Sequence, residues 1–364
     1  MTYRTCLACK VVGPPSATQG TRAEPVGFVS LYLSELLQVR PTEVRDEPCL
    51  AYGSGGIAYA LCRTAVRACD ICRPKLLASA RKWIQRSLVA AQTLTYPDWP
   101  RHSFSRGFAG LYATGAMIES LSNRPAPARR FIGLYLARVR RSFRSPELFE
   151  GAAGHLAGIA MLLMLPWSDA ETRKLQRTGD AIARRLITRL RKPTASLSRA
   201  GIAHGRAGLV LALVQWLAWS KSIDRNEVGA LVGACRAQRN NPFWANGSAG
   251  MVQLFALAER ALPNRGFKSR ARTQALRSVA AADSGHPMVI DGPPGIALAL
   301  LELASVDPSG AWRRRARNVM KSTLARLEVP EQRIYGLWGG LSGLYCLALD
   351  LQYGSWSGFP GLGA

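Results

Sequence analysis

The sequence predicts an all-α protein, an α/α toroid of seven helix-pair repeats in which a ring of inner helices is surrounded by outer helices. Three observations support this fold class. One glycine motif occurs seven times along the 364 residues. An apolar run and a basic amphipathic segment lie between successive motifs. The chain is rich in Ala, Leu and Arg and lacks the alternating β-branched strands that propeller blades need. An open superhelix is the alternative architecture.

The repeated motif is a pair of glycines three residues apart, followed at once by small and apolar residues. It recurs at intervals of roughly 42 to 54 residues, a period typical of helical arrays and toroids. We expect each motif to form a tight turn before an inner helix, because glycine lets neighbouring backbones approach closely. The seven turns begin at Gly53, Gly107, Gly151, Gly205, Gly247, Gly292 and Gly340.

The segments between the turns alternate in character. The first is apolar nearly all round, as a buried helix is, and the second carries basic residues on one face. Apolar runs are found at 57–61, 156–165, 209–217, 296–303 and 344–351, and amphipathic segments at 75–94, 129–143, 170–190 and 312–327. Residues 24–351 are therefore predicted to form one toroid domain, between an irregular N-terminal segment, 1–23, and a C-terminal tail, 352–364.

Lys and Arg outnumber Asp and Glu by 48 to 23, which gives a formal net charge of +25. This charge suits an anionic partner, but the chain has no RNP-like strand, zinc-finger spacing or basic zipper, so no nucleic acid is expected. The arginines concentrate in predicted outer helices, as at 138–144 and 313–317. They form either a solvated rim over apolar surface or a docking surface for an acidic peptide or protein.

The longest apolar stretches, 155–167 and 207–219, have about 13 residues, fewer than the ~20 that span a bilayer. Residues 1–20 lack the apolar core of a signal peptide. We therefore expect a cytoplasmic protein without a transmembrane segment.

Two of the cysteine pairs, Cys6/Cys9 and Cys69/Cys72, have the C-x-x-C spacing. The two pairs are too far apart for a zinc ribbon, and the second falls in a stretch with helical character. Solitary thiols are the preferred interpretation, and a zinc or redox role is the alternative.

The residue before each glycine turn is predicted to point toward the centre of the ring. Six of these seven residues are polar although the helices that follow are apolar. Polar residues commonly precede helices as caps, but caps favour Ser, Thr, Asp and Asn, and this set also contains Tyr, Arg, Glu and His. We therefore expect a polar central cavity. In order, the residues are Tyr52, Arg106, Glu150, His204, Asn246, Asp291 and Gly339.

The turns 201–208, 244–250 and 289–295 give the sequence a family resemblance. With seven glycine turns in order, a His before the fourth and a Trp before the fifth, residues 24–351 resemble the lanthionine synthetase C-like (LanC-like) family. The resemblance implies a seven-unit toroid that acts in lanthipeptide biosynthesis. It also implies a cyclase in which zinc activates a substrate Cys thiol for addition to a dehydroalanine or dehydrobutyrine.

The chain departs from that family at the zinc ligands. Ala245 stands in place of one Cys, and Ile290 and Asp291 stand in place of a Cys-His pair. A catalytic zinc needs about three protein ligands, and Ala and Ile offer no donor atom. We therefore expect no metal and no other cofactor.

Other positions match the resemblance. His204 stands where the family carries a His assigned to proton transfer, and Glu147 where the family often has an Asp. The candidate catalytic residues are His204 and Glu147, with the carboxylate holding the imidazole tautomer. The alternative is that His204 simply caps its helix or bonds a neighbouring turn. The candidate substrate-cavity residues are Tyr52, Arg106, Glu150, Trp244, Asn246 and Asp291.

Three functions remain open. The first is a zinc-independent cyclase that closes thioether rings on a ribosomally made peptide. The second is a non-catalytic LanC-like scaffold that binds a peptide or a partner modification enzyme. The third is a carbohydrate-active α/α-toroid enzyme with a carboxylate pair drawn from Glu147, Glu150 and Asp291.

Overall fold

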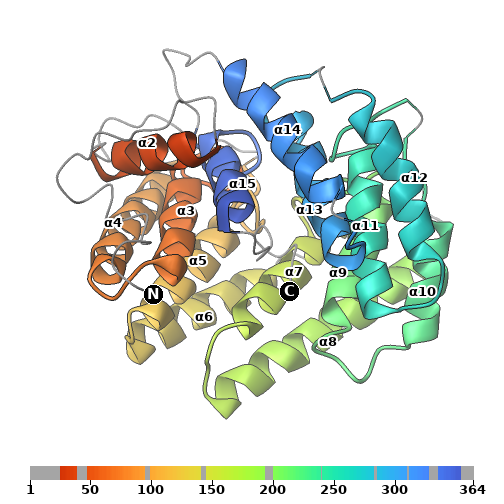
Figure 1. Ribbon diagram of the computed structural model, residues 1–364. Coiled ribbons are helices and arrows are strands. Elements are labelled where there is room, and N and C mark those ends of the chain that lie inside the picture. The colour runs from red at the N-terminus through yellow and green to blue at the C-terminus, as the bar shows by residue number, and fades with distance from the viewer. Residues whose placement is uncertain are drawn as a thin grey trace.

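The computed structural model describes residues 25–38, 47–94, 99–140, 145–192, 200–238, 240–282, 285–309, 311–327 and 335–353. Within these ranges the chain forms fourteen helices and no strand (Figure 1). The predicted segment 1–23 lies outside the described residues, as does the predicted tail apart from its first two residues. Among the described helices, none is long and apolar enough to cross a membrane.

Seven inner helices begin directly after the seven glycine turns. They are α3 (Ser54–Arg67), α5 (Phe108–Leu121), α7 (Ala152–Leu163), α9 (Arg206–Trp216), α11 (Ser248–Ala261), α13 (Pro293–Val306) and α15 (Leu341–Tyr353). Each packs against the next, and α15 packs against α3. All 12 residues of α7 are buried, as expected from a sequence that is apolar apart from His155.

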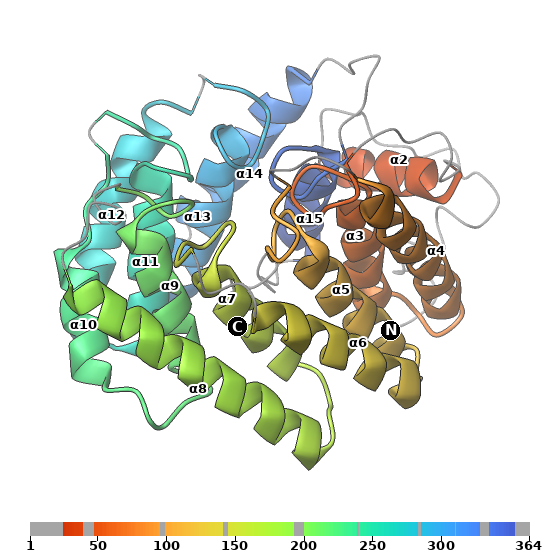
Figure 2. The same ribbon diagram turned by 180° about the vertical axis from the view of Figure 1, so that it is seen from behind.

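The outer helices cover the inner ring (Figures 1 and 2). They are α2 (Pro25–Gln38), α4 (Cys72–Thr93), α6 (Pro125–Val139), α8 (Asp169–Arg191), α10 (Arg225–Ala234), α12 (Phe267–Val279) and α14 (Ala311–Ala325). In α8 the buried residues recur every three or four positions, from Leu175 through Gly179 to Leu190, so one face meets the core. The rest of α8 carries its arginines toward solvent.

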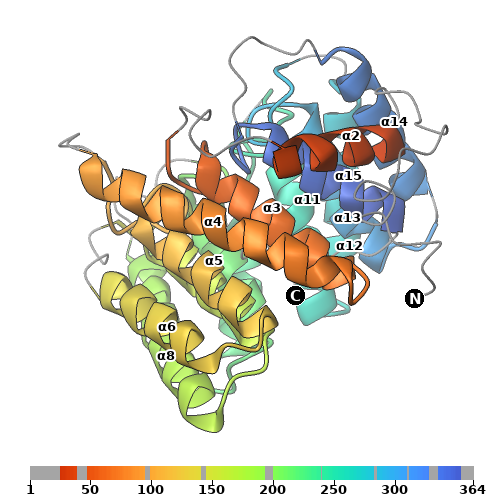
Figure 3. The same ribbon diagram turned by 90° about the vertical axis from the view of Figure 1, so that its left-hand side faces the viewer.

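The seventh outer helix comes from the opposite end of the chain. The second segment follows its inner helix in the first six repeats, but α15 is covered by α2, which packs against α15 and α14 (Figure 3). The Tyr32 and Ser342 hydroxyls lie 3.2 Å apart, and the Tyr335 hydroxyl donates to Glu35 at 3.0 Å. The last repeat is therefore completed by residues from both ends of the described chain.

A circle of hydrogen bonds joins the glycine turns. In six of the seven junctions, the residue two positions before the first glycine donates its backbone N–H to its counterpart in the next turn, at 2.9 to 3.2 Å. In the remaining junction the Ser103 hydroxyl donates to the Phe149 carbonyl at 3.1 Å. The backbone donor–acceptor pairs are Ala51–Ser105, Phe149–Ala203, Ala203–Ala245, Ala245–Ile290, Ile290–Trp338 and Trp338–Ala51. Because the last bond returns to the first turn, the ring is closed, and the predicted toroid is confirmed over the open superhelix.

The second glycine of each turn is required by a close backbone approach. A Cβ on Gly154 would overlap the Leu148 carbonyl oxygen, and one on Gly208 would overlap that of Ile202. The first glycine of these turns is extended, with φ of −122° at Gly151 and −114° at Gly205, so left-handed backbone is not the reason for glycine there. The motif therefore marks places where an inner helix starts against its own preceding loop.

Helices α3 and α15 meet in a buried polar contact that we call the closing interface, formed by Arg63, Arg67, Asp350, Thr64 and Tyr345. The Arg63 and Arg67 guanidinium groups lie 2.7 and 2.8 Å from the Asp350 carboxylate, whose side chain is 0% exposed. The Thr64 and Tyr345 hydroxyls are 2.7 Å apart. These polar side chains satisfy one another away from water, so they stabilise the junction of the first and last inner helices in one register.

The C-x-x-C pair at the start of α4 is not joined by a disulfide in the described structure. Cys69 is half-buried and Cys72 is buried. The pair Cys6/Cys9 lies outside the described residues.

Candidate functional site

The residue before each glycine turn differs from its neighbours in exposure. In six turns it is partly or fully exposed, while the residues on either side of it are buried; in the seventh, Gly339 is buried. The circle of turns is closed by hydrogen bonds, so these exposed positions face a common region at one end of the toroid. We call this group the central cluster: Tyr52, Arg106, Glu150, His204, Asn246 and Asp291, together with Glu147.

A short polar contact in the central cluster joins His204 and Glu147. The His204 Nδ1 atom lies 2.6 Å from the Glu147 Oε2 atom, with side chains 37% and 20% exposed. A carboxylate accepts hydrogen bonds, so Nδ1 is the donor in this contact, and when the imidazole is neutral Nε2 carries the lone pair. The two residues come from different turns, and the Phe149 ring packs 5.6 Å from the imidazole. The sequence placed both residues in one site, and the structure brings them into direct contact.

A second polar pair lies beside the first. The Arg106 guanidinium donates to Glu150 at 3.1 Å, lies 4.0 Å from Glu47, and sits 5.8 Å from the centre of the Tyr52 ring. Burial alone would lower the pKa of Arg106, but the hydrogen bond and charge of Glu150 outweigh burial, so the pKa is raised. Arg106 therefore stays cationic, with Glu150 as its hydrogen-bonded partner.

Asp291 and Asn246 complete the cluster in different ways. Partial burial raises the pKa of Asp291, and the neighbouring His204, in its protonated form, opposes that rise. Burial raises the pKa of Tyr52, and the Asp291 charge adds to that rise. The positive charge of Arg106 opposes it, but the net direction is upward. Asn246 accepts a backbone hydrogen bond from Gln238 at 3.0 Å. Asp291 is thus electrostatically coupled to His204. Asn246 is instead linked through its backbone to Gln238, in the segment before the fifth turn.

Aromatic side chains form a layer beneath the polar groups. Trp244 stacks on Trp338 with ring centres 4.5 Å apart, and Trp338 contacts Phe149 at 5.9 Å. Trp244 is 0% exposed and donates through Nε1 to Gln253 at 2.6 Å, so in this conformation it supports Trp338 and does not line the central cluster.

Sequence reasoning missed Phe149, Trp338 and Glu47. Phe149 and Trp338 each stand directly before a residue that is predicted to face the centre, and this position is the sequence feature that could have indicated them. Because they are aromatic, the polar pattern before the glycine turns does not include them. Glu47, six residues before Gly53, carried no comparable signal.

The residues present do not fit a zinc ion. At the three positions where the resemblance implies ligands, Ala245 and Ile290 are buried apolar side chains whose backbones are joined by a 3.0 Å hydrogen bond, and only Asp291 offers a donor. Within the described ranges, no group of three or more His, Cys, Asp or Glu side chains converges as a metal site would require. One carboxylate does not hold a catalytic zinc ion.

Two of the three carboxylates considered for a glycosidase pair have partners in the cluster. Glu147 contacts His204, and Glu150 accepts a hydrogen bond from Arg106. Asp291 is the third, and partial burial raises its pKa, the direction that a glycosidase acid requires.

His155 belongs to the core. It is fully buried in α7, and burial lowers its pKa to about 3, so it stays neutral. Its neighbour Tyr135 donates a hydrogen bond to the His155 carbonyl at 2.8 Å. We assign it a packing role.

Comparison with known proteins gives one informative result. No family model matches the sequence, and no curated protein matches it. Among solved structures, the fold is similar to that of nisin cyclase, with a TM-score of 0.66 and 15% sequence identity over 91% of this chain and 94% of that chain. At this identity the likeness concerns the fold. The chain has the LanC-like helical toroid fold, as its seven glycine turns predict.

Proposed function

We propose that this protein is a zinc-independent LanC-like cyclase that adds a Cys thiol to a dehydroalanine or dehydrobutyrine of a ribosomally made peptide. The observation that carries the proposal is the 2.6 Å contact between His204 and Glu147 among exposed polar groups of the ring. The similarity of the fold to nisin cyclase supports the same reaction class. The proposed place of action is the cytoplasm, where thiols such as Cys69 and Cys72 stay reduced.

The proposed reaction is a conjugate addition with one base. The thiol S–H bond breaks as His204 Nε2 accepts the proton, and the thiolate sulfur bonds to Cβ of the dehydroamino acid. The C=C electron pair moves toward Cα and the adjacent carbonyl. The proton held on Nε2 then passes to Cα, which restores the neutral imidazole and leaves the peptide mass unchanged.

A histidine base is sufficient for this nucleophile. A free thiol has a pKa of about 8.5 and is already a few per cent ionised at neutral pH, so it needs less activation than a hydroxyl. Glu147 holds the imidazole tautomer and stabilises the imidazolium that forms. Arg106, held by Glu150, lies in the same cluster and is placed to attract the charge that develops on the substrate carbonyl.

The test uses a synthetic peptide that carries one dehydroalanine and one Cys. The full-length protein should consume the free thiol, measured by alkylation with iodoacetamide and mass spectrometry, and a chelator should not change the rate. His204→Ala should slow cyclisation by about 10²- to 10⁴-fold, the usual contribution of a general base. His286→Ala, which alters an exposed histidine outside the central cluster, is the matched control.

Two results would refute the assignment. One is a His204→Ala variant as fast as the parent, and the other is loss of activity with chelator that added zinc restores. A Glu147→Gln variant separates positioning from folding: the neutral amide keeps the shape but stabilises the imidazolium less, so the rate should fall while the circular dichroism spectrum is unchanged.

A non-catalytic scaffold is the second candidate, and the apolar Ala245 and Ile290 favour it because they remove the donors the family uses. Such a scaffold would bind the dehydrated peptide, or a partner modification enzyme, without consuming thiol. Binding with no thiol loss over the uncatalysed rate would support it.

A further inference from the structure

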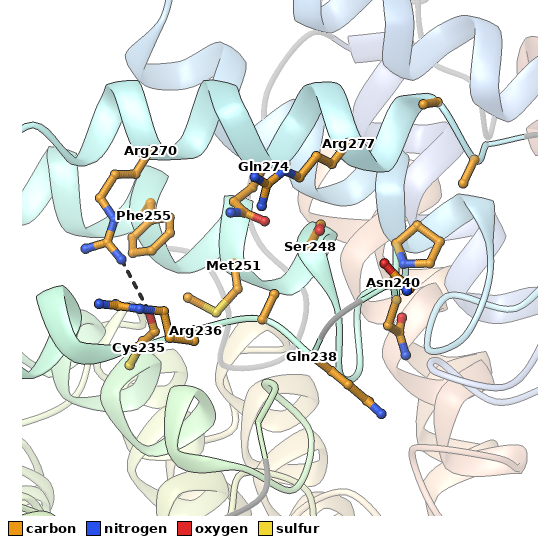
Figure 4. Close-up of a pocket in the computed structure, with 15 residues that line it drawn as sticks. Cys235, Arg236, Gln238, Asn240, Ser248, Met251, Phe255, Arg270, Gln274 and Arg277 are labelled. Atoms are coloured by element: carbon orange, nitrogen blue, oxygen red, sulfur yellow. Dashed lines mark hydrogen bonds between the residues drawn. The ribbon is translucent and has the colours of Figure 1, made fainter.

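A cavity of about 860 Å³ lies on the outer side of the fifth repeat (Figure 4). One wall is α12, and the other is the chain between α10 and α11, including Cys235–Gln238 and Asn240–Pro242. In Figure 4 the cavity extends from Arg236 and Arg270 at one end to Asn240 at the other. None of the residues that line it belongs to the central cluster or takes part in the proposed proton transfer.

Two arginines converge at one end of this cavity. Arg236 donates to the carbonyls of Gly233 and Cys235 at 2.8 Å each, and Arg270 donates to the same two carbonyls at 3.2 Å each. The Arg270 guanidinium is also fixed against the Phe255 ring, 4.1 Å from its centre. Two guanidinium groups that share the same acceptors hold their remaining N–H donors close together.

The positive charge at this end is not neutralised within the described part of the chain. Neither arginine forms an ion pair there, although many other arginines do. Burial lowers the pKa of Arg270, and the charge of Arg236 lowers it further, which is the electrostatic cost of two adjacent cations. An anion bound between them would relieve that repulsion.

Helix α12 extends the cationic wall. Arg270, Gln274 and Arg277 are spaced by four and then three residues, so they lie on one face of the helix and all line the cavity. The Gln274 Oε1 atom is buried without a hydrogen-bond partner in the described residues. The Gln274 acceptor thus lies on the same helix face as the Arg270 and Arg277 cations. This combination suits a ligand that carries both N–H groups and negative charge.

From this geometry we infer that the cavity binds an extended acidic peptide segment. Seven residues of helix separate Arg270 from Arg277 by about 10 Å. That separation is too large for one phosphate or sulfate. It lies between about 7 and about 13 Å, the spacings of side chains two and four residues apart that share one face of an extended chain, so two carboxylates on that face can each reach one arginine. Amides of Gln238, Asn241 and Gln274 can pair with peptide N–H and C=O groups, and Met251 supplies an apolar surface.

The fifth turn connects the cavity to the central cluster. Asn241 and Ser248, which line the cavity, flank the turn that carries Asn246, and the Gln238 backbone N–H donates to the Asn246 carbonyl. A peptide held on the outer side of this turn therefore lies one turn away from the polar groups of the centre. Binding here would tether the peptide while another part of it reaches the centre.

The test is fluorescence anisotropy with the full-length protein and a labelled peptide of about ten residues with alternating Glu and Ala. We expect saturable binding that weakens with salt, and no binding of the peptide with Gln in place of Glu. Arg277→Gln should weaken binding about five- to tenfold, and Arg236→Gln with Arg277→Gln should weaken it further, as expected for lost charge-assisted hydrogen bonds.

The matched control removes the same charge elsewhere. Arg177→Gln with Arg184→Gln alters two exposed arginines of α8 that do not line this cavity, and it should change the affinity less than twofold. His204→Ala should bind the peptide as the parent does, so failure of the proposed reaction and failure of this site are distinguishable.

Three outcomes would overturn the inference. Equal losses in the α8 control would show attraction to the overall charge. Full displacement of the peptide by about 1 mM inorganic phosphate would show a small-anion site. Tighter binding of a single-stranded oligonucleotide that is also lost with Arg277→Gln would identify a nucleic-acid site.

Discussion

The closing interface gives a quantitative prediction for Asp350→Asn. The substitution keeps the shape of the side chain and removes the single negative charge that faces Arg63 and Arg67. Asp350 is 0% exposed, and the two arginine side chains are 5% and 13% exposed, so water replaces little of the lost interaction. Each charge pair contributes about 4 kcal/mol at an effective dielectric constant of about 20, before desolvation is subtracted.

The net loss is smaller than the sum of the two pairs, because ionising Asp350 in the core already costs desolvation energy. Removing one partner of a buried ion pair typically costs about 3–5 kcal/mol, since the remaining cations stay buried without compensation. We therefore expect Asp350→Asn to lower the free energy of unfolding by about 3–5 kcal/mol. Urea denaturation at pH 7, followed by circular dichroism, measures this quantity.

An exposed pair with the same geometry is the control. Arg191 and Glu227 are also 2.7 Å apart, but their side chains are 65% and 22% exposed, so Glu227→Gln should have a much smaller effect. Replacing Arg63 and Arg67 by Met and Asp350 by Leu in one variant should recover most of the lost free energy of unfolding, because the desolvation cost disappears with the charges. A loss below about 1 kcal/mol for Asp350→Asn would refute the view that these charges stabilise the ring.

Two further predictions concern the glycine turns and the outer helices. Gly154→Ala should destabilise the protein by about 1–3 kcal/mol, because its Cβ would overlap the Leu148 carbonyl. Gly133 lies at an exposed position of α6 with open space around its Cβ position, so Gly133→Ala should stabilise the protein by about 0.5–1 kcal/mol. Thermal unfolding of both variants measures the contrast, and equal effects would contradict the steric argument. Asp307 accepts hydrogen bonds from Arg272 at 2.6 and 2.7 Å, and these hold its pKa at about 2. Because the folded pKa lies below the unfolded value, its contribution is present above about pH 4 and is lost toward pH 2, so the stability difference between the parent and Asp307→Asn should shrink over that interval in acid titrations.

The glycine turns were predictable from sequence because their cause is local. The second glycine is needed where the first turn of the inner helix touches its own preceding carbonyl, so the requirement recurs in each repeat. The residue before the turn then lies at the exposed edge of the circle, which is why the polar set could be chosen without a structure. The roles of His204 and Glu147 in chemistry stay predictions, although their contact is direct.

Features that depend on distant residues were not predictable in this way. The pairing of α2 with α15 joins residues 310 positions apart, and no local period indicates it. The cavity beside α12 depends on Arg236 approaching Arg270 from another segment, so the sequence indicated an arginine excess but not where two cations would meet. Phe149 and Trp338 look like ordinary core residues in sequence. Phe149 becomes a neighbour of His204, and Trp338 a neighbour of Phe149, only when turns that are distant in sequence meet.

The pairing of α2 with α15 also bears on how the chain acquires its fold. Helix α2 is synthesised about 310 residues before α15, the inner helix against which it packs, so the burial of Phe28, Val29, Leu33 and Leu36 is delayed until α15 has been made. Non-local contacts of this kind slow folding and leave apolar surface exposed in the meantime. The first six repeats can pack in the order of synthesis, whereas the ring becomes complete only after translation of its last helix.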